Sequence, residues 1–575
     1  LTLLFLFSLS INSFAQNFHL KVDGSNPTEN KIIDSLNYTT KHSNLKSLFT
    51  EINISTQKLS KKGYLDLKIL ENTQTNDSTY YTKINLGEIV KNIHIYIGKN
   101  NPLFQPSETR NDTIIIPYTG IENLLNLKNI EAEKKGFALN KLSLKNIRRK
   151  KSTIHADLIL NSEKKRTVNS IIINYANNNH KDYFPKGHLK QLNKKHLNTI
   201  FNQENIKKLH EDINNYTFVS QTKYPEILFT KDSTKIYVYI EKRKANNFDG
   251  YIGFTNNENK KLNINGYLDL TLQNTLRAGE KFSLYWKSDG NQQRTFDSKL
   301  EIPYIFNSSL GIKAQLNIFK QDSTFQNSKT AIDVGYYLNY NSKIYLGYQS
   351  TESSDIQNTN NTSISDFRNS YFTTSFDYLK TDTYNELFPE KSKFNLIIGF
   401  GKRNTSNQPE TVSPSNQFYS NLNFSYNFEL NKKNFININS HNFYLKSDNY
   451  ITNELFRFGG TNSIRGFLEN SLQANFASYI LTEYRYIVSR NLFIHSITDY
   501  ALYQDITRIN DPKKINKLIS IGAGLGIQTS NGLIRINLTN GSFNAQNIKL
   551  YNTIVNICYN VKFWYLQKKY FYLLG

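Results

Sequence analysis

From residue 247 onward, apolar and polar side chains alternate along the sequence. Between residues 393 and 400, Phe394, Leu396, Ile398 and Phe400 alternate with Lys393, Asn395, Ile397 and Gly399. A period of two is typical of β-strands, because successive side chains point to opposite faces of the sheet. The pattern predicts sixteen strands, at residues 248–255, 261–272, 280–288, 295–306, 309–319, 330–340, 343–350, 370–380, 392–402, 417–430, 434–446, 476–488, 491–503, 517–529, 532–540 and 552–564.

The strand number and the connections favour a membrane barrel over residues 247–564. Sixteen is an even number, and most predicted strands approach the ~9–11 residues that a tilted strand needs to cross a bilayer. Short turns alternate with longer loops, as in outer-membrane barrels. The longer predicted loops lie at residues 320–329, 351–369, 403–416, 447–475 and 504–516. The alternative is a soluble β-sandwich or propeller, but a propeller should repeat every ~40–50 residues, and no such repeat is visible.

Residues 17–243 differ, because helical spacing interrupts the alternating stretches. Apolar residues recur at this spacing in three places: Leu45, Leu48 and Ile52; Leu124, Leu127 and Ile130; and Ile206, Leu209 and Ile213. The pattern predicts three α+β units at residues 17–98, 100–167 and 168–243, each in the order β-α-α-β-β, with the strand pair around residues 80–97 in the first unit. Each unit could close a small core. Generic spacer domains and binding modules both fit this pattern.

Composition narrows the classes of protein that fit. Lys and Arg exceed Asp and Glu to give a net charge of +23, and the mean hydropathy of −0.54 excludes a bundle of transmembrane helices. The content of 38 Tyr and 37 Phe argues against plain disorder. The single Cys558 excludes an intramolecular disulfide and a cysteine-based zinc site. We expect the phosphate groups of lipids to balance this positive charge, and we do not expect a nucleic-acid partner.

The two ends of the sequence carry further signals. Residues Leu3 to Leu9 form a short apolar core, and Ser13-Phe14-Ala15 matches a small-x-small cleavage site. This predicts a secretory signal over residues 1–15, and the alternative is a buried first strand or helix. Residues 565–575 follow the last predicted strand, and the pattern offers no explanation for them. Hydrolase and nucleotide-binding motifs are missing, so we expect neither an enzyme nor a cofactor.

The longest predicted loop, 447–475, contains a glycine-rich string around an arginine. The string comprises Phe458, Gly459, Gly460, Thr461, Asn462, Ser463, Ile464, Arg465, Gly466 and Phe467. A guanidinium donates paired hydrogen bonds to carboxylates, so Arg465 could anchor a loop inside a water-filled barrel. The glycines would allow the backbone to turn, and Phe467 would act as an apolar plug. The alternative is a solvated loop arginine.

The alternation of inward and outward side chains along a strand identifies carboxylates that could form an ion pair with Arg465. In the predicted strand 476–488, Ile480 and Tyr484 face outward, which leaves Glu483 inside. In the predicted strand 491–503, the same argument leaves Asp499 inside. Both carboxylates are therefore candidate partners of Arg465.

The string Ile464-Arg465-Gly466-Phe467 resembles the (V/I)RG(F/Y) signature of the outer-membrane assembly and secretion superfamily that includes BamA, TamA and the two-partner-secretion transporters. It also lies between the eleventh and twelfth strands, where that superfamily keeps its sixth loop. The three N-terminal units resemble POTRA (polypeptide-transport-associated) domains, and the layout is closest to that of TamA. The last strand, with Tyr559, Val561 and Phe563, resembles the aromatic-ended strand that assembly machinery recognises. The resemblance implies that the loop folds into the lumen. It also implies that Arg465 pairs with the acidic positions of the last strands, with Asp499 as the first partner and Glu483 as the second.

The resemblance also implies a function. The barrel would lie in the outer membrane of a Gram-negative bacterium, with the POTRA-like domains in the periplasm. These domains would receive unfolded outer-membrane or secreted clients, or bind periplasmic or inner-membrane subunits, by adding a strand to a sheet edge. The seam between the first and last strands would help to insert or export the client. The alternatives are a two-partner-secretion pore for one dedicated protein and a passive porin-like barrel.

Overall fold

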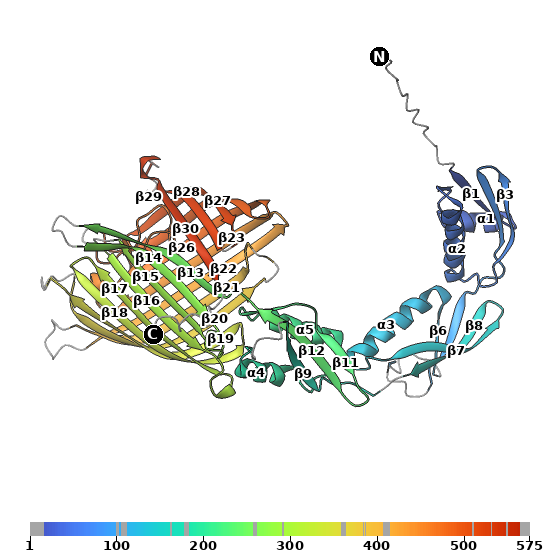
Figure 1. The fold of residues 1–575 in the computed structure, drawn as a ribbon, viewed down its shortest axis with the longest axis horizontal. Helices are drawn as coiled ribbons and strands as arrows, with labels where there is room; N and C mark the ends of the chain where they lie inside the picture. The colour runs from blue at the N-terminus through green and yellow to red at the C-terminus, as the bar shows by residue number, and fades with distance from the viewer. Residues whose placement is uncertain are drawn as a thin grey trace, which may run out of the picture. The chain divides into compact units, whose positions relative to one another are not determined.

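The computed structural model describes residues 17–563, apart from 99–102, 105–111, 162–163, 177–182, 257–261, 290–292, 358–363, 383–384, 386, 406–413, 509–510, 531, 545 and 548–549. The predicted signal sequence, 1–15, and the extension 565–575 lie outside the described residues. The chain forms two compact units, Leu1–Val168 with Asn198–Asn205, and Asn169–Leu197 with Ile206–Gly575. Each unit is described here by itself (Figure 1).

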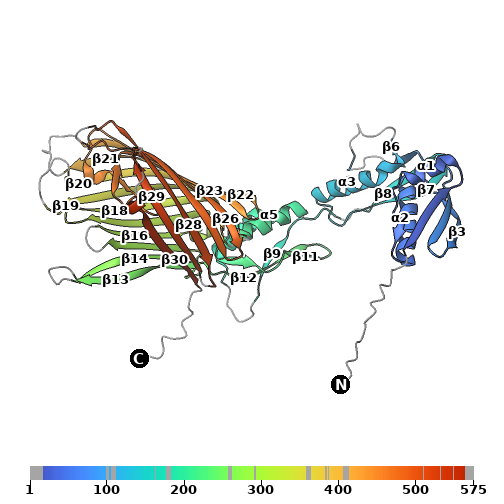
Figure 2. The same cartoon turned by 90° about the horizontal axis from the view of Figure 1, so that it is seen from above.

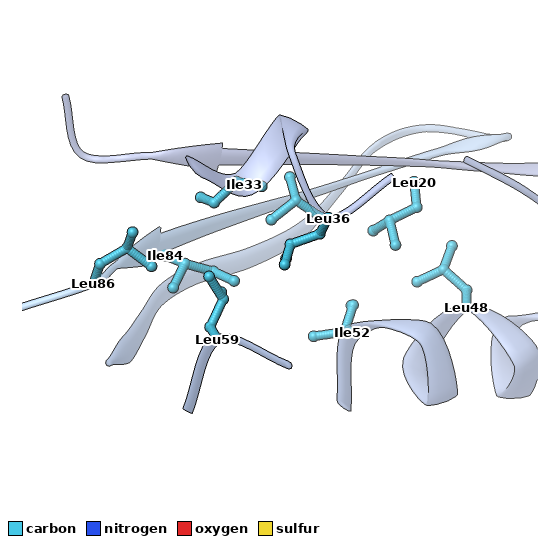
Figure 3. Close-up of a cluster of buried hydrophobic side chains, with 9 residues drawn as sticks. Leu20, Ile33, Leu36, Leu48, Ile52, Leu59, Ile84 and Leu86 are labelled. Carbon is cyan, nitrogen blue, oxygen red and sulfur yellow. The ribbon is translucent and has the colours of Figure 1, made fainter. Parts of the chain in front are cut away.

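The first N-terminal domain packs two helices on one sheet. Its elements are β1 (Phe18–Gly24), α1 (Pro27–Asp34), β2 (Lys41–His42), α2 (Leu45–Lys61), β3 (Lys68–Asn76) and β4 (Thr79–Asn85), with the sheet order β2-β1-β4-β3. The Asn44 side chain caps α2 by accepting a hydrogen bond from the Ser47 amide at 2.8 Å, which begins the helix at that point. Leu48, Ile52 and Leu59 of α2 then face Leu20 and Ile84 of the sheet in an apolar core (Figure 3).

The second domain contains β5 (Asn92–Tyr96), β6 (Thr113–Pro117), α3 (Ile121–Lys134), β7 (Lys141–Lys150) and β8 (Thr153–Asn161), in the sheet order β6-β5-β8-β7. The sequence analysis placed β5 in the first unit, but β5 pairs with β6 and β8. The reason is that Ile93 and Ile95 share a core with Ile154. The described part of this domain also has one α-helix where two were expected, preceded by the 3-10 turn Tyr118–Gly120.

The third domain follows the expected order of elements, with one additional short strand after the two helices. It contains β9 (Ser170–Tyr175), α4 (Lys186–His196), α5 (Gln203–Asn214), β10 (Val219–Gln221), β11 (Glu226–Phe229) and β12 (Thr234–Lys242). β12 runs parallel to β9 and antiparallel to β10 and β11. Ile236, Val238 and Ile240 of β12 are buried, which accounts for their alternation in the sequence.

Helix α4 packs directly on turns of the barrel. The ring of His188 contacts Phe184, Tyr216 and Phe218 of its own domain and Tyr304 and Tyr340 of the barrel. His188 is completely buried, and neither ring nitrogen has a hydrogen-bond partner. A Cβ added at Gly279 would lie 1.9 Å from this ring, so glycine is required where the turn meets the helix.

Residues 246–563 form a closed antiparallel barrel of sixteen strands, which confirms the predicted fold (Figures 1 and 2). The strands are β13 (Asn246–Asn256), β14 (Leu262–Gln273), β15 (Lys281–Asp289), β16 (Gln293–Ile302), β17 (Leu310–Gln321), β18 (Phe325–Asn339), β19 (Ser342–Asp355), β20 (Phe367–Thr381), β21 (Glu390–Thr405), β22 (Ser415–Asn431), β23 (Asn434–Ser447), β26 (Phe476–Ser489), β27 (Leu492–Gln504), β28 (Ile515–Gln528), β29 (Gly532–Phe543) and β30 (Ile554–Phe563).

The loops differ from the prediction in two places. The expected loop 320–329 is mostly ladder, because β17 and β18 pair as far as Gln321 and Phe325. The long loop between β23 and β26 contains a small two-stranded sheet of its own, β24 (Phe456–Phe458) and β25 (Leu472–Ala474), which the sequence analysis did not predict.

The barrel turns its apolar side chains outward and its polar side chains inward. On β18, Ile332 and Val334 are exposed on the outer face, while Asp333 between them is buried in the lumen. An apolar outer face around a polar interior suits a barrel surrounded by lipid. No helix among the described residues has the length and apolar character needed to cross a membrane.

Candidate functional site

The loop between β23 and β26 lies in the lumen against the inner wall of the barrel. Its residues Phe458 and Ile464 are buried with Tyr479, Ala501 and Tyr503, which are inward-facing residues of β26 and β27. The rings of Phe458 and Tyr503 meet edge to face, with centroids 5.3 Å apart. The apolar contacts therefore hold this loop on the wall that carries the predicted carboxylates.

Arg465 lies at the centre of this contact and binds both predicted carboxylates. Its Nε donates to Asp499 Oδ2 at 2.8 Å, and Nη2 donates to Asp499 Oδ1 at 2.5 Å. Its Nη1 donates to Glu483 Oε1 at 2.5 Å. The Arg465 backbone amide adds a 3.3 Å bond to Asp499. All three side chains are almost completely inaccessible to solvent, so these are charge-assisted bonds in a confined site.

Further cations surround Glu483. Arg485 Nε donates to Glu483 Oε2 at 2.7 Å, and Arg535 Nη2 lies 3.4 Å from the same oxygen. Arg485 also donates to Asn427 on β22 at 2.9 Å. Arg485 shares the inward face of β26 with Glu483, two residues earlier, but the sequence analysis assigned it no role. Three guanidinium groups thus face two carboxylates, and Glu483 links the loop to several strands.

The glycines of the string occupy positions where a side chain would not fit. Gly466 has a φ of +78°, and an added Cβ would lie 2.6 Å from the Asn540 carbonyl carbon on β29. Gly459 and Gly460 also have positive φ angles of 114° and 98°, which favour glycine. Phe467, the expected apolar plug, is half-buried and packs against the same cluster as Ile464.

Two further ion pairs on this loop were not foreseen. Arg403 on β21 pairs with Glu454 of the loop, and Lys287 on β15 pairs with Glu469 at 3.0 Å. Parity could have placed Arg403 inside, because it continues the inward-facing set of the predicted strand 392–402. Its partner depends on the path of the loop, for which the sequence carries no signal.

The seam between the first and last strands is short. In the part of the chain that the structure describes, β13 and β30 are paired at three positions, Asn246 with Phe563, Asn247 with Lys562, and Phe248 with Val561. β13 pairs with β14 over ten positions, from Asn247 to Asn256. In the predicted recognition strand, Tyr559 is exposed on the outer face and Val561 is half-buried. The side chain of Phe563 lies outside the described residues.

The chemistry of the site is that of an ionic anchor. Among the described residues, no group of His, Cys, Asp or Glu side chains is arranged to hold a metal ion. The arginines donate to carboxylates that accept, and each partner is fixed by a strand or by packed loop residues. The arrangement can hold a loop across the lumen or release it.

Comparison with solved structures identifies the fold. CdiB from Acinetobacter baumannii aligns with a TM-score of 0.50 and 13% identity over 78% of this chain and 83% of that one. CdiB from Escherichia coli gives a TM-score of 0.49 and 12% identity over 88% and 96% of the two chains. BamA from Haemophilus ducreyi lacking POTRA domains 1-3 gives 0.46 and 15%, over 81% and 98%. No protein-family model and no curated protein sequence matches the chain.

The chain has the fold of CdiB from Acinetobacter baumannii, with α+β domains before a closed sixteen-stranded barrel. At 13% identity the likeness concerns the fold alone. The closer likeness to TamA, which the domain number suggested, stays a prediction.

Proposed function

We propose that this chain is an outer-membrane assembly or translocation factor that passes unfolded protein clients from the periplasm into or across the membrane. The observation that carries the proposal is the lumenal anchor, in which Arg465 binds Asp499 and Glu483. Buried ion pairs hold this loop in the path that a client would take through the barrel. Such a loop is useful where passage must be controlled.

The N-terminal domains supply a plausible place for clients to bind. β3 is the edge strand of the first sheet, and all nine of its residues are exposed. An exposed edge presents free backbone N–H and C=O groups, to which an extended segment can add as a new strand. In this proposal the domains lie in the periplasm and receive unfolded outer-membrane or secreted proteins, or partner subunits.

The seam supplies the second element of the proposed mechanism. Among the described residues, Asp249–Asn256 of β13 and Ile554–Asn560 of β30 are not paired with each other. A client strand could add to either edge by main-chain hydrogen bonds alone, which explains tolerance of client sequence. The proposal assigns no catalytic step and no cofactor to the chain.

Depletion of the protein in its own organism, followed by complementation, tests the proposal. Arg465→Ala should fail to complement, and Arg465→Lys should complement in part, because lysine keeps the charge but not the paired geometry. Arg368→Ala, at a residue exposed on β20, is the matched control and should complement fully. Each variant must be present in the membrane at the wild-type level.

An inventory of outer-membrane and secreted proteins in the depleted cells separates the functions. Broad loss of outer-membrane proteins supports assembly. Loss of one exported product supports a dedicated secretion pore. An unchanged inventory, or full complementation by Arg465→Ala, would contradict the proposal and favour a passive barrel.

A further inference from the structure

We propose that the lumenal loop is fixed at two places, at its base and at Arg465, and that Arg403 is a positioning residue which holds the base of the loop independently of Arg465. This inference rests on the proposed function only in that the loop must matter for client passage. The placement of the loop itself can be measured without any client.

The base of the loop is held by a second buried ion pair. Arg403, near the end of β21, pairs with Glu454 of the loop through Nη1. The same Nη1 donates to the Asn449 carbonyl oxygen at 3.0 Å. The Arg403 and Glu454 side chains are 2% and 1% exposed, so this pair is as inaccessible to solvent as the pairs of Arg465.

Glu454 is fixed from other directions as well. Gln417 on β22 donates to Glu454 Oε2 at 2.8 Å, and the Ile451 amide donates to Oε1 at 3.1 Å. Tyr371 on β20 donates to Gln417 Oε1 at 2.5 Å, which orients the amide. A carboxylate that accepts bonds from β21, β22 and its own turn has its position fully defined.

The residue before Glu454 extends the attachment to other strands. Asn453 Nδ2 donates to Ser353 Oγ on β19 at 2.7 Å and to the Ser365 carbonyl at 2.8 Å. Its own carbonyl accepts from Asn327 on β18 at 2.7 Å. Residues 449–454 therefore bind β18, β19, β21 and β22, which are strands that Arg465 does not reach.

The two anchors have opposite polarity. At the base the barrel wall supplies the cation and the loop supplies the anion, whereas at Arg465 the roles are reversed. Neither loop charge can bind at the other site, because like charges would meet: Glu454 would face Asp499, or Arg465 would face Arg403. The polarity therefore keeps each loop charge at its own site.

Spin labels on the loop test this inference in the purified full-length protein, in a Cys558→Ser background. One label replaces Thr452 at the base and another replaces Leu468 beyond Arg465. Arg403→Glu and Glu454→Arg should each mobilise the label at 452 and leave the label at 468 unchanged. Arg465→Ala should do the reverse. The double swap Arg403→Glu with Glu454→Arg should restore at least half of the immobile fraction at 452.

The control is the exposed pair Arg368 and Glu352, which joins β20 to β19 with both side chains about two-thirds exposed. Swapping its charges should move neither label. Heat-modifiable migration in gel electrophoresis confirms that the barrel of each variant is folded. Where a charge-reversal variant is not folded, Arg403→Gln or Glu454→Gln takes its place. An immobile label at 452 in the single variants, or no restoration in the swap, would overturn the inference.

The outcome is separable from the proposed function. If Arg403→Glu mobilises the base and cells expressing it still assemble their outer-membrane proteins, the anchor exists and the proposed function of the loop is wrong. If the label at 452 stays immobile in Arg403→Glu, the inference fails, whether or not the cells assemble their outer-membrane proteins.

Discussion

The first N-terminal domain and the barrel use the same alternation of apolar and polar residues with opposite results. In the domain, Leu20 and Val22 of β1 face a dry core and are 3% and 2% exposed. In the barrel, Ile332 and Val334 of β18 are exposed and Asp333 is buried. The apolar side chains form the interior of the domain but the outer face of the barrel.

The difference shows where each region obtains its stability. The domain is stabilised by burying apolar surface away from water. The barrel is stabilised by its closed hydrogen-bond ladder and by polar networks in its lumen, and its apolar outer face suits contact with lipid. Substitutions of one chemical kind should therefore act oppositely in the two regions, and four predictions follow in order of expected effect.

Removal of one lumenal carboxylate should have the largest effect. Asp499→Ala leaves part of the Arg465 charge without its partner in a buried site, and we expect a loss of about 3–5 kcal/mol of unfolding free energy. Urea unfolding of the protein in lipid measures this loss. Asp23→Ala, in the partly exposed pair Lys21–Asp23 of the first domain, should cost less than about 1 kcal/mol. Equal losses would contradict the comparison.

Truncation of a leucine to alanine should destabilise the core of the domain but have little effect on the outer face of the barrel. Leu48→Ala empties a fully buried position, which costs about 2–5 kcal/mol in comparable cores. Leu346→Ala, on the outer face of β19, should change barrel stability by less than about 1 kcal/mol. Hydrogen exchange resolved by region reports both values in one protein. A larger effect at Leu346 would mean that the outer face is covered by protein.

A charge on the outer face distinguishes lipid from water. Leu346→Arg should cost about 2–4 kcal/mol if the face meets the bilayer. Leu70→Arg, at an exposed position of β3 in the first domain, should stay within about 0.5 kcal/mol. Membrane insertion of both variants into vesicles, followed by denaturant titration, measures the difference. Tolerance of Leu346→Arg would place this face in water.

The contact between α4 and the barrel should weaken in acid. Burial lowers the pKa of His188 to about 3, and Lys343 acts in the same direction. Tyr216, Tyr304 and Tyr340 surround the ring. Because the unfolded state binds the proton more readily, stability is lost as the pH falls below about 6.5, by about 2 kcal/mol at pH 5.

Hydrogen exchange in α4 at pH 7.5 and pH 5, corrected for intrinsic rates, measures this effect. His188→Phe keeps an aromatic ring in the cage but cannot bind a proton, so it should remove most of the pH dependence. If His188→Phe loses hydrogen-exchange protection in acid to the same extent as the wild type, the effect belongs to another titratable group.

Most of the barrel could be predicted from sequence, because the alternation of side chains between the two faces of a strand is a local property. Each of the sixteen predicted strands corresponds to an observed one. Strand ends were less predictable: Gln321 and Phe325 extend the ladder where the residues look like a loop, because pairing depends on the neighbouring strand. The position of β5 was missed for the same reason, since Ile93 fits either core by its own pattern.

The candidate site was predictable in part. Inward parity singled out Glu483 and Asp499, and the structure brings both to Arg465. The pair of Arg403 and Glu454 could not be found, because its partners are 51 residues apart and meet only through the path of the loop. The cations around Glu483 depend likewise on the curvature of the wall, which brings Arg535 of β29 towards β26.

The loop also touches both flanks of the short seam. Gly466 packs against Asn540 on β29, one strand before the last, and Glu469 binds Lys287 on β15, two strands after the first. A separation of β13 from β30 that also parts β15 from β29 would stretch this segment or break the ion pair. The three residues from Phe467 to Glu469 thereby join the two flanks of the seam through the interior of the barrel.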